Sequence, residues 1–162
     1  MSTSVRIAPA RASDVPVLLA LIRELASYES SSATVTEDDL SRDGFGEAPR
    51  YSALIAWLGD EAVGFAFYAF TYSTYRGAPV LFLEDLYVRP EHRGKGTGLA
   101  LMRCLAREAL ERRCARFVWE VLDWNEKAIR FYAALGAELR RERLMTWLEG
   151  DALRELANEA HR

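Results

Sequence analysis

The feature that most constrains this chain is a glycine-rich turn that links an apolar strand to an amphipathic helix. The turn reads Arg93-Gly94-Lys95-Gly96-Thr97-Gly98 and follows the predicted strand 80–88. Glycines at every second position remove the Cβ atoms that would hold a ligand away from the backbone. The first amide groups of the next helix have no intrahelical partner and lie at the positive end of its dipole. With the charges of Arg93 and Lys95, the turn predicts a site for an anion such as a pyrophosphate.

Spacing separates this turn from two other phosphate loops. A dinucleotide fingerprint, G-x-G-x-x-G, needs a glycine where Leu99 stands, and the chain has no G-x-x-x-x-G-K-[ST] run of a Walker A loop. The pattern that remains is Arg93-x-x-Gly96-x-Gly98. Taken alone, this pattern is also compatible with a glycine-rich turn that carries basic surface residues. Features elsewhere in the chain are needed to distinguish the two interpretations.

Composition narrows the class of protein. A length of 162 residues suits one domain with a core of its own, so we expect a single domain over residues 1–162. The net charge of -3 does not indicate a nucleic-acid surface. The sequence shows no signal peptide and no apolar run of membrane-spanning length, which predicts a cytoplasmic protein without membrane contact. Cys104 and Cys114 lie about 15 Å apart on the helical rise, too far for a disulfide, and no metal-ligand spacing is present, so no metal is expected.

Hydrophobic periodicity predicts alternating strands and helices. Strands are expected at 4–9, 51–57, 62–72, 80–88 and 116–122, with two more strand-like stretches within 137–149. Helices are expected after Ser13 or Asp14 as far as Tyr28, from Thr36 to Gly44, after Gly98, from about Glu126 to Leu135, and at the C-terminus. The strand 80–88, the helix after Gly98 and the strand 116–122 form a βαβ unit, which predicts a parallel, right-handed crossover.

Five segments of the chain resemble one family in the right order. They are 24–29, 43–47, 83–88, the glycine turn, and Trp124-Asn125-Glu126 leading to 131–137. Together they resemble the GNAT superfamily of acyltransferases and, within it, the diamine (spermidine/spermine) and thialysine N-acetyltransferase branch. The resemblance implies an α/β (α+β) GNAT fold, a mixed twisted sheet flanked by helices on both faces. It implies transfer of an acetyl group from acetyl-CoA to a primary amine of a small molecule (a diamine, a polyamine or a lysine- or thialysine-like amine) by direct attack in a ternary complex.

The resemblance also implies the acetyl-CoA site. In this family the co-substrate lies in a V-shaped opening between two parallel strands, here 80–88 and 116–122, and its pantetheine arm pairs with the exposed edge of the first. The residues so implied are Leu86, Tyr87 and Val88 at the edge, Arg93, Gly94, Lys95, Gly96, Thr97, Gly98 and Leu99 around the pyrophosphate, and Asn125 beside the cofactor arm. The family commonly forms homodimers, so a homodimer is expected.

Adjacent carboxylates at Glu84 and Asp85 interrupt an apolar strand, where they are costly unless they are partnered. Neighbouring strand residues point to opposite faces unless a bulge re-aims one of them, and the family carries a bulge near this place. By resemblance, Glu84 binds the substrate amine or takes its proton, and Asp85 is a second contact. Tyr28 and Glu29 match a pair that lines the distal amine site. From the residues alone, Asp85 could face solvent or pair with an arginine, and Tyr28 and Glu29 could be an ordinary exposed helix end.

Tyr132 matches the family tyrosine that lies near the thioester sulfur and is proposed as the general acid. Without the resemblance, Tyr132 and Ile129 share a helix face at i, i+3, which is typical of a core tyrosine. The Trp124-Asn125 segment upstream and Leu135-Gly136 downstream favour the catalytic role.

One loop departs from the polyamine enzymes, which carry an acid and a tryptophan where this chain reads 72–77. Arg76 in that loop would repel the second ammonium of a polyamine and could accept a substrate carboxylate, which favours lysine- or thialysine-like amines. Two alternatives stay open. A protein or peptide amine would need an open groove, against which the aromatic side chains of Phe70, Tyr72 and Tyr75 argue. A catalytically idle acetyl-CoA sensor would not need Glu84 and Tyr132.

Overall fold

The computed structural model describes residues 4–158, and the chain divides into two compact units, residues 1–120 and 121–162. The core of the first unit is a five-stranded mixed sheet in the order β1-β2-β3-β4-β5. The strands β1 (Arg6–Pro9), β2 (Ser52–Leu58), β3 (Glu61–Ser73) and β4 (Ala78–Val88) pair antiparallel with their neighbours, and β5 (Arg116–Trp119) pairs parallel with β4. The parallel crossover predicted around the glycine turn is therefore confirmed.

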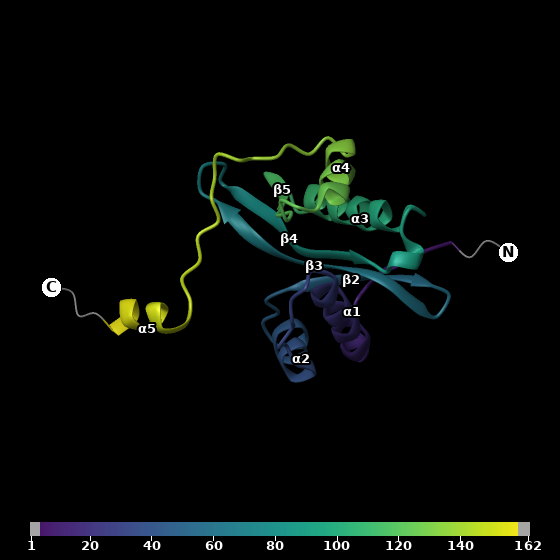
Figure 1. Ribbon diagram of the computed structural model, residues 1–162, viewed down its shortest axis with the longest axis horizontal. Coiled ribbons are helices and arrows are strands. Elements are labelled where there is room, and N and C mark those ends of the chain that lie inside the picture. The colour runs from purple at the N-terminus through teal and green to yellow at the C-terminus, as the bar shows by residue number, and fades with distance from the viewer. Residues whose placement is uncertain (1–3, 159–162) are drawn as a thin grey trace. The chain divides into compact units, whose positions relative to one another are not determined.

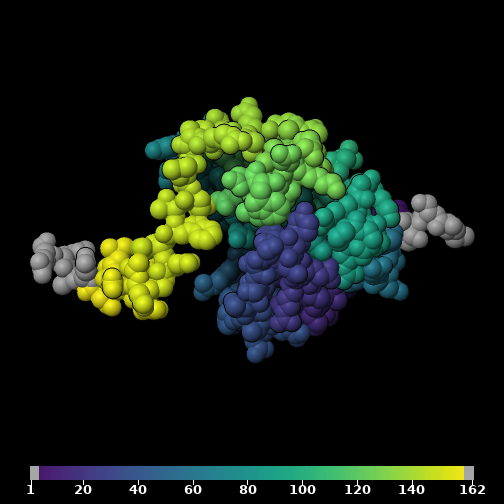
Figure 2. All heavy atoms as spheres, viewed as in Figure 1, coloured from purple at the N-terminus to yellow at the C-terminus, as the bar shows by residue number. Residues whose placement is uncertain are grey.

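Helices cover both faces of this sheet, as the sequence predicts (Figure 1). On one face lie α1 (Val15–Tyr28) and α2 (Glu37–Phe45), whose purple and blue spheres stand side by side in Figure 2. On the other face lies α3 (Thr97–Glu111). The apolar stripe of α1 packs in one cluster with the sheet, formed by Leu18, Leu21, Leu25, Ala53, Ile55, Ala62, Phe65 and Tyr87. The helix α3 buries its own stripe, which includes Leu101 and Leu105.

Local sequence signals fix the helix ends. Thr36 caps α2 in a reciprocal capping box, because the Asp39 N–H donates to Thr36 Oγ1 at 3.2 Å and the Thr36 N–H donates to Asp39 Oδ2 at 3.0 Å. The helix continues through the predicted stop at Gly44 and ends at Phe45. Behind it, the Tyr51 hydroxyl donates to the Leu40 carbonyl of α2 at 2.7 Å, and the Tyr51 ring stacks on Phe67 of β3 with ring centroids 4.1 Å apart. Tyr51 therefore ties α2 to β3.

The second unit contains α4 (Glu126–Ala134) and α5 (Gly150–Asn158). Gly136 has a φ of +84° and follows α4, as expected for a C-terminal glycine. The prediction of two strands within 137–149 is wrong, because this stretch contains neither strand nor bridge. An apolar run becomes a strand only where its backbone groups find a partner. Here the large side chains stay exposed, among them Leu144 at 88% and Trp147 at 76%.

None of the helices within residues 4–158 combines the length and apolar character that a bilayer crossing requires.

Candidate active site

The strand β4 carries one extra residue at Glu84. Tyr68 of β3 pairs with Leu83 and Phe67 pairs with Asp85, so Glu84 has no opposite residue on β3. A bulge of this kind bends its strand and re-aims the extra side chain. Glu84 is exposed, whereas the preceding Leu83 is buried. The bulge expected from the family resemblance is therefore present, and the residue that forms it is the predicted catalytic glutamate.

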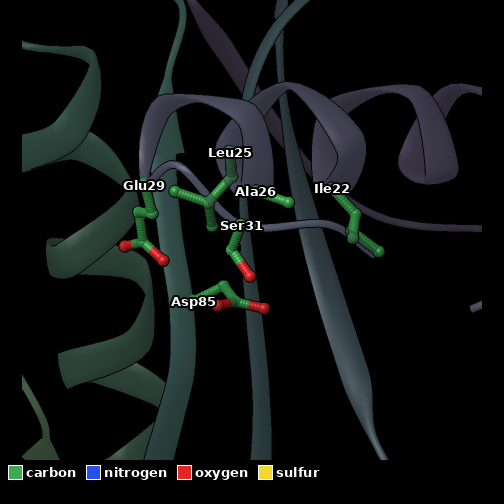
Figure 3. A pocket seen from close by; sticks show the side chains of 6 residues that line it. All are labelled: Ile22, Leu25, Ala26, Glu29, Ser31 and Asp85. Atoms are coloured by element: carbon green, nitrogen blue, oxygen red, sulfur yellow. The ribbon is translucent and has the colours of Figure 1, made fainter. Parts of the chain in front are cut away.

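A small cavity lies between the end of α1 and Asp85 of β4 (Figure 3). Its volume is about 110 Å³. Figure 3 shows the carboxylates of Glu29 and Asp85 and the hydroxyl of Ser31 directed toward the same space. The rest of the lining is aliphatic and comes from α1, namely Ile22, Leu25 and Ala26. Acid groups in an aliphatic lining suit an ammonium group on an alkyl chain.

Electrostatics single out Asp85. Burial raises the pKa of Asp85 to about 6, and the nearby carboxylates of Glu84 and Glu29 add to the rise. Burial also raises the pKa of Glu29. Each of these effects disfavours the ionised form of the acid. A cation between the two carboxylates would favour the ionised forms and lower both pKa values. Perturbed acids of this kind concentrate at functional sites.

The strand β4 extends beyond its pairing with β5. The parallel register runs from Val80 opposite Arg116 to Leu83 opposite Trp119, and no strand of residues 4–158 continues it along residues 84–88. The antiparallel ladder with β3 decides which backbone groups of residues 84–88 point to this unpaired side. Because the Arg89 N–H donates to the Val63 carbonyl at 2.9 Å, alternation directs the groups of Tyr87 toward β3 and those of Leu86 and Val88 away from it. Leu86 and Val88 thus form a strand edge at which an extended ligand can pair.

The glycine turn leads from this edge into α3. It begins after the short 3₁₀ helix η2 (Pro90–His92), and α3 starts at Thr97, before the predicted Gly98. Gly94 and Gly96 have φ of +73° and +86°, and a Cβ atom at either would meet no heavy atom within 4 Å. Gly96 is the N-cap of α3 and offers no capping side chain. Within the part of the chain that the structure describes, the buried Thr97 hydroxyl also has no hydrogen-bond partner. Open space, uncapped helix amides and an unsatisfied hydroxyl fit the pyrophosphate of acetyl-CoA.

The two basic residues of the turn differ in their surroundings. Lys95 is exposed, and its Nζ donates to the Glu91 carbonyl at 2.9 Å. Arg93 is half-buried, and its Nε donates to the Val88 carbonyl at 2.7 Å. Its guanidinium carbon lies 4.5 Å from the centroid of the Tyr28 ring and 5.6 Å from that of Tyr87. Arg93 thus joins the turn to the last residue of α1.

Asn125 and Tyr132 belong to α4 in the second unit. Asn125 is the N-cap of α4, and its Oδ1 accepts a hydrogen bond from the Ala128 N–H at 3.2 Å. Tyr132 is half-buried, with its ring centroid 5.3 Å from that of Phe131. Their roles toward acetyl-CoA stay predictions. In the first unit, the structure brings Tyr28, Glu29, Glu84 and Asp85 to the same region as the turn, and their roles also stay predictions.

Sequence reasoning missed most of the cavity lining. Ile22, Leu25, Ala26 and Glu29 are spaced i, i+3, i+4 and i+7, so one face of α1 and its C-cap residue supply all four. That spacing is the signal that could have identified them once Glu29 was suspected. Ser31 could not be found in this way. It reaches the cavity because Ser30 adopts a left-handed φ of 56° and the Ser31 N–H returns to the Ala26 carbonyl at 2.8 Å.

The model of the acetyltransferase (GNAT) family matches residues 18–137. The chain belongs to the GNAT acetyltransferase family. This GNAT chain is therefore an acyltransferase, and the family inferred from the five sequence segments is confirmed.

Relatives support the branch as well. Thialysine N-epsilon-acetyltransferase of Bos taurus is 41% identical to the GNAT chain, over 96% of this chain and 98% of the relative. An integron cassette protein from the mobile metagenome of V. cholerae superimposes with a TM-score of 0.83 and 31% identity, covering 98% of this chain and 99% of that one. An aminoglycoside N-acetyltransferase in complex with CoA shares the fold, with a TM-score of 0.75, 21% identity and coverage of 92% and 97%.

Proposed function

We propose that this enzyme transfers the acetyl group of acetyl-CoA to a primary amine of a small molecule, by direct attack in a ternary complex. The observation that carries the proposal is the arrangement along β4. The bulge at Glu84 and the acid cavity at Asp85 lie directly beside the strand edge of Leu86 and Val88, and the glycine turn follows. An amine site and an acyl-donor site are thus adjacent on one strand. The Bos taurus relative, named for an amine substrate, supports the same reading.

Acetyl-CoA would be held by the backbone of the turn that runs from Arg93 to Leu99, and by the Leu86 groups and the Val88 N–H at the strand edge. It supplies an activated acetyl thioester. The uncapped amides of α3 and the Thr97 hydroxyl would bind the pyrophosphate. Asn125, which caps α4, would lie beside the cofactor arm.

The cavity would take the substrate cation. Asp85 and Glu29 would attract an ammonium group, while Ile22, Leu25 and Ala26 contact its alkyl chain. A volume of about 110 Å³ is well below the ~300 Å³ at which drug-sized sites begin, which favours a slender amine. An ammonium must lose a proton before it can attack, and the exposed Glu84 at the bulge would bind it or receive that proton. Tyr132 would donate its phenolic proton to the departing thiolate as the general acid.

Arg76 lies far from the cavity of its own chain. Arg76 lies in the turn between β3 and β4, while Asp85 lies seven residues beyond the first residue of β4, Ala78. At ~3.3 Å per strand residue, the Cα atoms of Ala78 and Asp85 are about 23 Å apart, and Arg76 precedes Ala78 in the chain. Arg76 therefore cannot bind the carboxylate of a small amine that sits in the cavity of the same chain. The preference for a lysine- or thialysine-like amine over a diamine or polyamine rests on the relatives instead.

We also propose that both units form one acetyltransferase domain. The family match runs from residue 18 to residue 137 and so crosses the boundary at residue 120. Neither α4 nor α5 contains a buried residue, and a segment of this size without a core does not fold by itself.

A homodimer is proposed on the apolar surface of the second unit. Between residues 139 and 156 this unit exposes seven large apolar side chains, Leu139, Leu144, Met145, Trp147, Leu148, Leu153 and Leu156. Single exposed apolar residues are ordinary, but a run of this density marks an association surface. Sedimentation equilibrium should give twice the monomer mass, and Trp147→Ser combined with Leu144→Ser should shift the mass toward the monomer. A wild-type monomer at all concentrations would contradict the dimer.

The test of the function is CoA release from acetyl-CoA with a panel of lysine, thialysine, putrescine, spermidine and an N-terminal peptide. Turnover on a small amine that collapses in Tyr132→Phe is expected, with Tyr75→Phe as the matched control because Tyr75 is 93% exposed. Turnover on the peptide alone would favour a protein amine as substrate. Acetyl-CoA binding without turnover on any amine would favour a sensor.

A further inference from the structure

Arg93 matches the first position of the pyrophosphate motif, yet its side chain is engaged elsewhere. Its Nε donates to the Val88 carbonyl at 2.7 Å, and its guanidinium lies over the Tyr28 ring at 4.5 Å and near the Tyr87 ring at 5.6 Å. A guanidinium stacked on an aromatic face and bonded through Nε is held in one orientation. We propose that Arg93 is a positioning residue that couples the acetyl-CoA turn to the amine cavity, and that it is not a phosphate ligand.

Arg93 acts first on the strand edge of β4. The Val88 carbonyl points away from β3, toward the side on which an extended ligand can pair. Arg93 takes this acceptor, so the edge left for a ligand consists of the Leu86 groups and the Val88 N–H. The bond also fixes where the turn leaves β4, because Gly94 follows Arg93 directly.

Arg93 also acts on the end of α1. Tyr28 is the last residue of α1, and Glu29, its C-cap, lines the cavity with Asp85. Next to them Ser30 adopts a left-handed φ of 56°, which is uncommon for a residue other than glycine. By stacking on Tyr28, Arg93 holds the helix end from which Glu29 and Ser31 reach the cavity. Tyr87 completes the contact from the core side, where it is 5% exposed.

The consequence is a specific kinetic signature, which rests on the proposed function. Removing the guanidinium should loosen the Glu29 side of the cavity and therefore raise the KM for the amine more than it changes kcat. We expect about a fivefold rise in amine KM for Arg93→Gln, in the range that a half-buried cation–π contact gives. Arg93→Lys should behave like Arg93→Gln, because an ammonium has neither the planar stacking surface nor the Nε donor. Tyr28→Leu should give a similar rise, and the Arg93→Gln/Tyr28→Leu double variant should add little to either single change.

The donor substrate separates this role from phosphate binding. Each variant is assayed with acetyl-CoA and with S-acetylpantetheine, which carries the thioester but no phosphate. A positioning residue predicts the same fold loss with both donors. A loss seen with acetyl-CoA alone, restored by Arg93→Lys, would overturn the proposal and make Arg93 a phosphate ligand. Additive effects of Arg93→Gln and Tyr28→Leu would also overturn it. Arg103→Gln, on the exposed side of α3, is the matched control.

A second readout keeps the test independent of turnover. CoA binding to the wild type, Arg93→Gln and Arg93→Lys is measured by calorimetry. If no amine reacts with the wild type, the proposed function fails, while CoA affinity still decides whether Arg93 is a phosphate ligand. CoA affinity within about threefold of the wild type in Arg93→Gln supports a positioning role. A loss of about tenfold or more that Arg93→Lys restores contradicts it.

Discussion

Asp85 should make the protein less stable as the pH rises, and Asp85→Asn should remove this dependence. Burial, with repulsion from Glu84 and Glu29, raises the pKa of Asp85 from 3.8 to about 6. The folded state therefore binds a proton more tightly at this site than the unfolded chain does. Stability from this site is complete below pH 3.8 and is lost as the pH rises through about 6.

The magnitude follows from the distance between the two pKa values. At about 1.4 kcal/mol per pH unit, the change from 3.8 to about 6 is worth about 3 kcal/mol as an upper value. Relative to the wild type, Asp85→Asn should therefore gain up to about 3 kcal/mol in unfolding free energy between pH 4 and pH 8. A carboxamide has nearly the volume of the acid and carries no charge, so the cavity keeps its shape.

Urea unfolding at pH 4, 5, 6, 7 and 8 measures this difference directly. Asp60→Asn in the exposed turn between β2 and β3 removes one negative charge without touching the cavity, and it corrects for the general effect of charge. A wild type and an Asp85→Asn variant whose stabilities run parallel from pH 4 to pH 8 would refute the reasoning, because the buried carboxyl would then have no raised pKa. A lysine-like ligand should narrow the gap at pH 8, since its ammonium stabilises the ionised form of Asp85.

Three further substitutions test the turn, the bulge and the core. Gly96→Ala should destabilise the fold by about 1–2 kcal/mol and weaken CoA binding in calorimetry, because Gly96 has a φ of +86°. The control Gly77→Ala, at a φ of +62° in the turn before β4, should lose stability but keep its CoA affinity. Equal CoA affinity in the two variants would contradict the assignment of the glycine turn as the CoA site. Deletion of Glu84 should abolish CoA binding because the bulge disappears. Glu84→Ala keeps the bulge and should therefore keep CoA binding. Loss of CoA binding in both variants would contradict a geometric role of the bulge. Leu105→Ala should lower the free energy of unfolding in urea by about 2–5 kcal/mol, because Leu105 is fully buried. The control Leu110→Ala should lower it by about 0.5 kcal/mol or less, because Leu110 is 78% exposed on the same helix. Similar losses in the two variants would mean that α3 packs differently.

The sequence was most informative where the signal is local. The turn from Arg93 to Gly98 and the cap at Thr36 are readable because their residues are close in the chain and each has a distinct chemical task. The order of strands and the parallel crossover follow from periodicity and connection rules. The predicted strands within 137–149 failed for the complementary reason, since apolar residues alone do not supply a pairing partner.

Contacts between distant residues could not be predicted. Arg93 meets Tyr28 across 65 positions, and Arg89 pairs with Glu24 across the same separation, with an Nη2–Oε1 distance of 2.8 Å. No spacing rule links such pairs, because only the packing of α1 on the sheet brings them together. The resemblance named Tyr28 and Arg93 separately, as an amine residue and a cofactor residue, and gave no reason to expect their contact.

The bulge explains why the candidate amine site and the candidate cofactor edge occur at the same place. The extra residue in β4 is Glu84, and the pairing of β4 with β5 stops at Leu83, the residue before it. A bulge bends its strand, so β4 turns away from β5 from this point on and the groups of Leu86 and Val88 are left without a strand partner. The same insertion keeps Asp85 opposite Phe67, on the face covered by α1, where the cavity forms. One inserted residue therefore opens the edge and places both carboxylates beside it. This is a physical reason for an acid pair to interrupt a strand that is otherwise apolar.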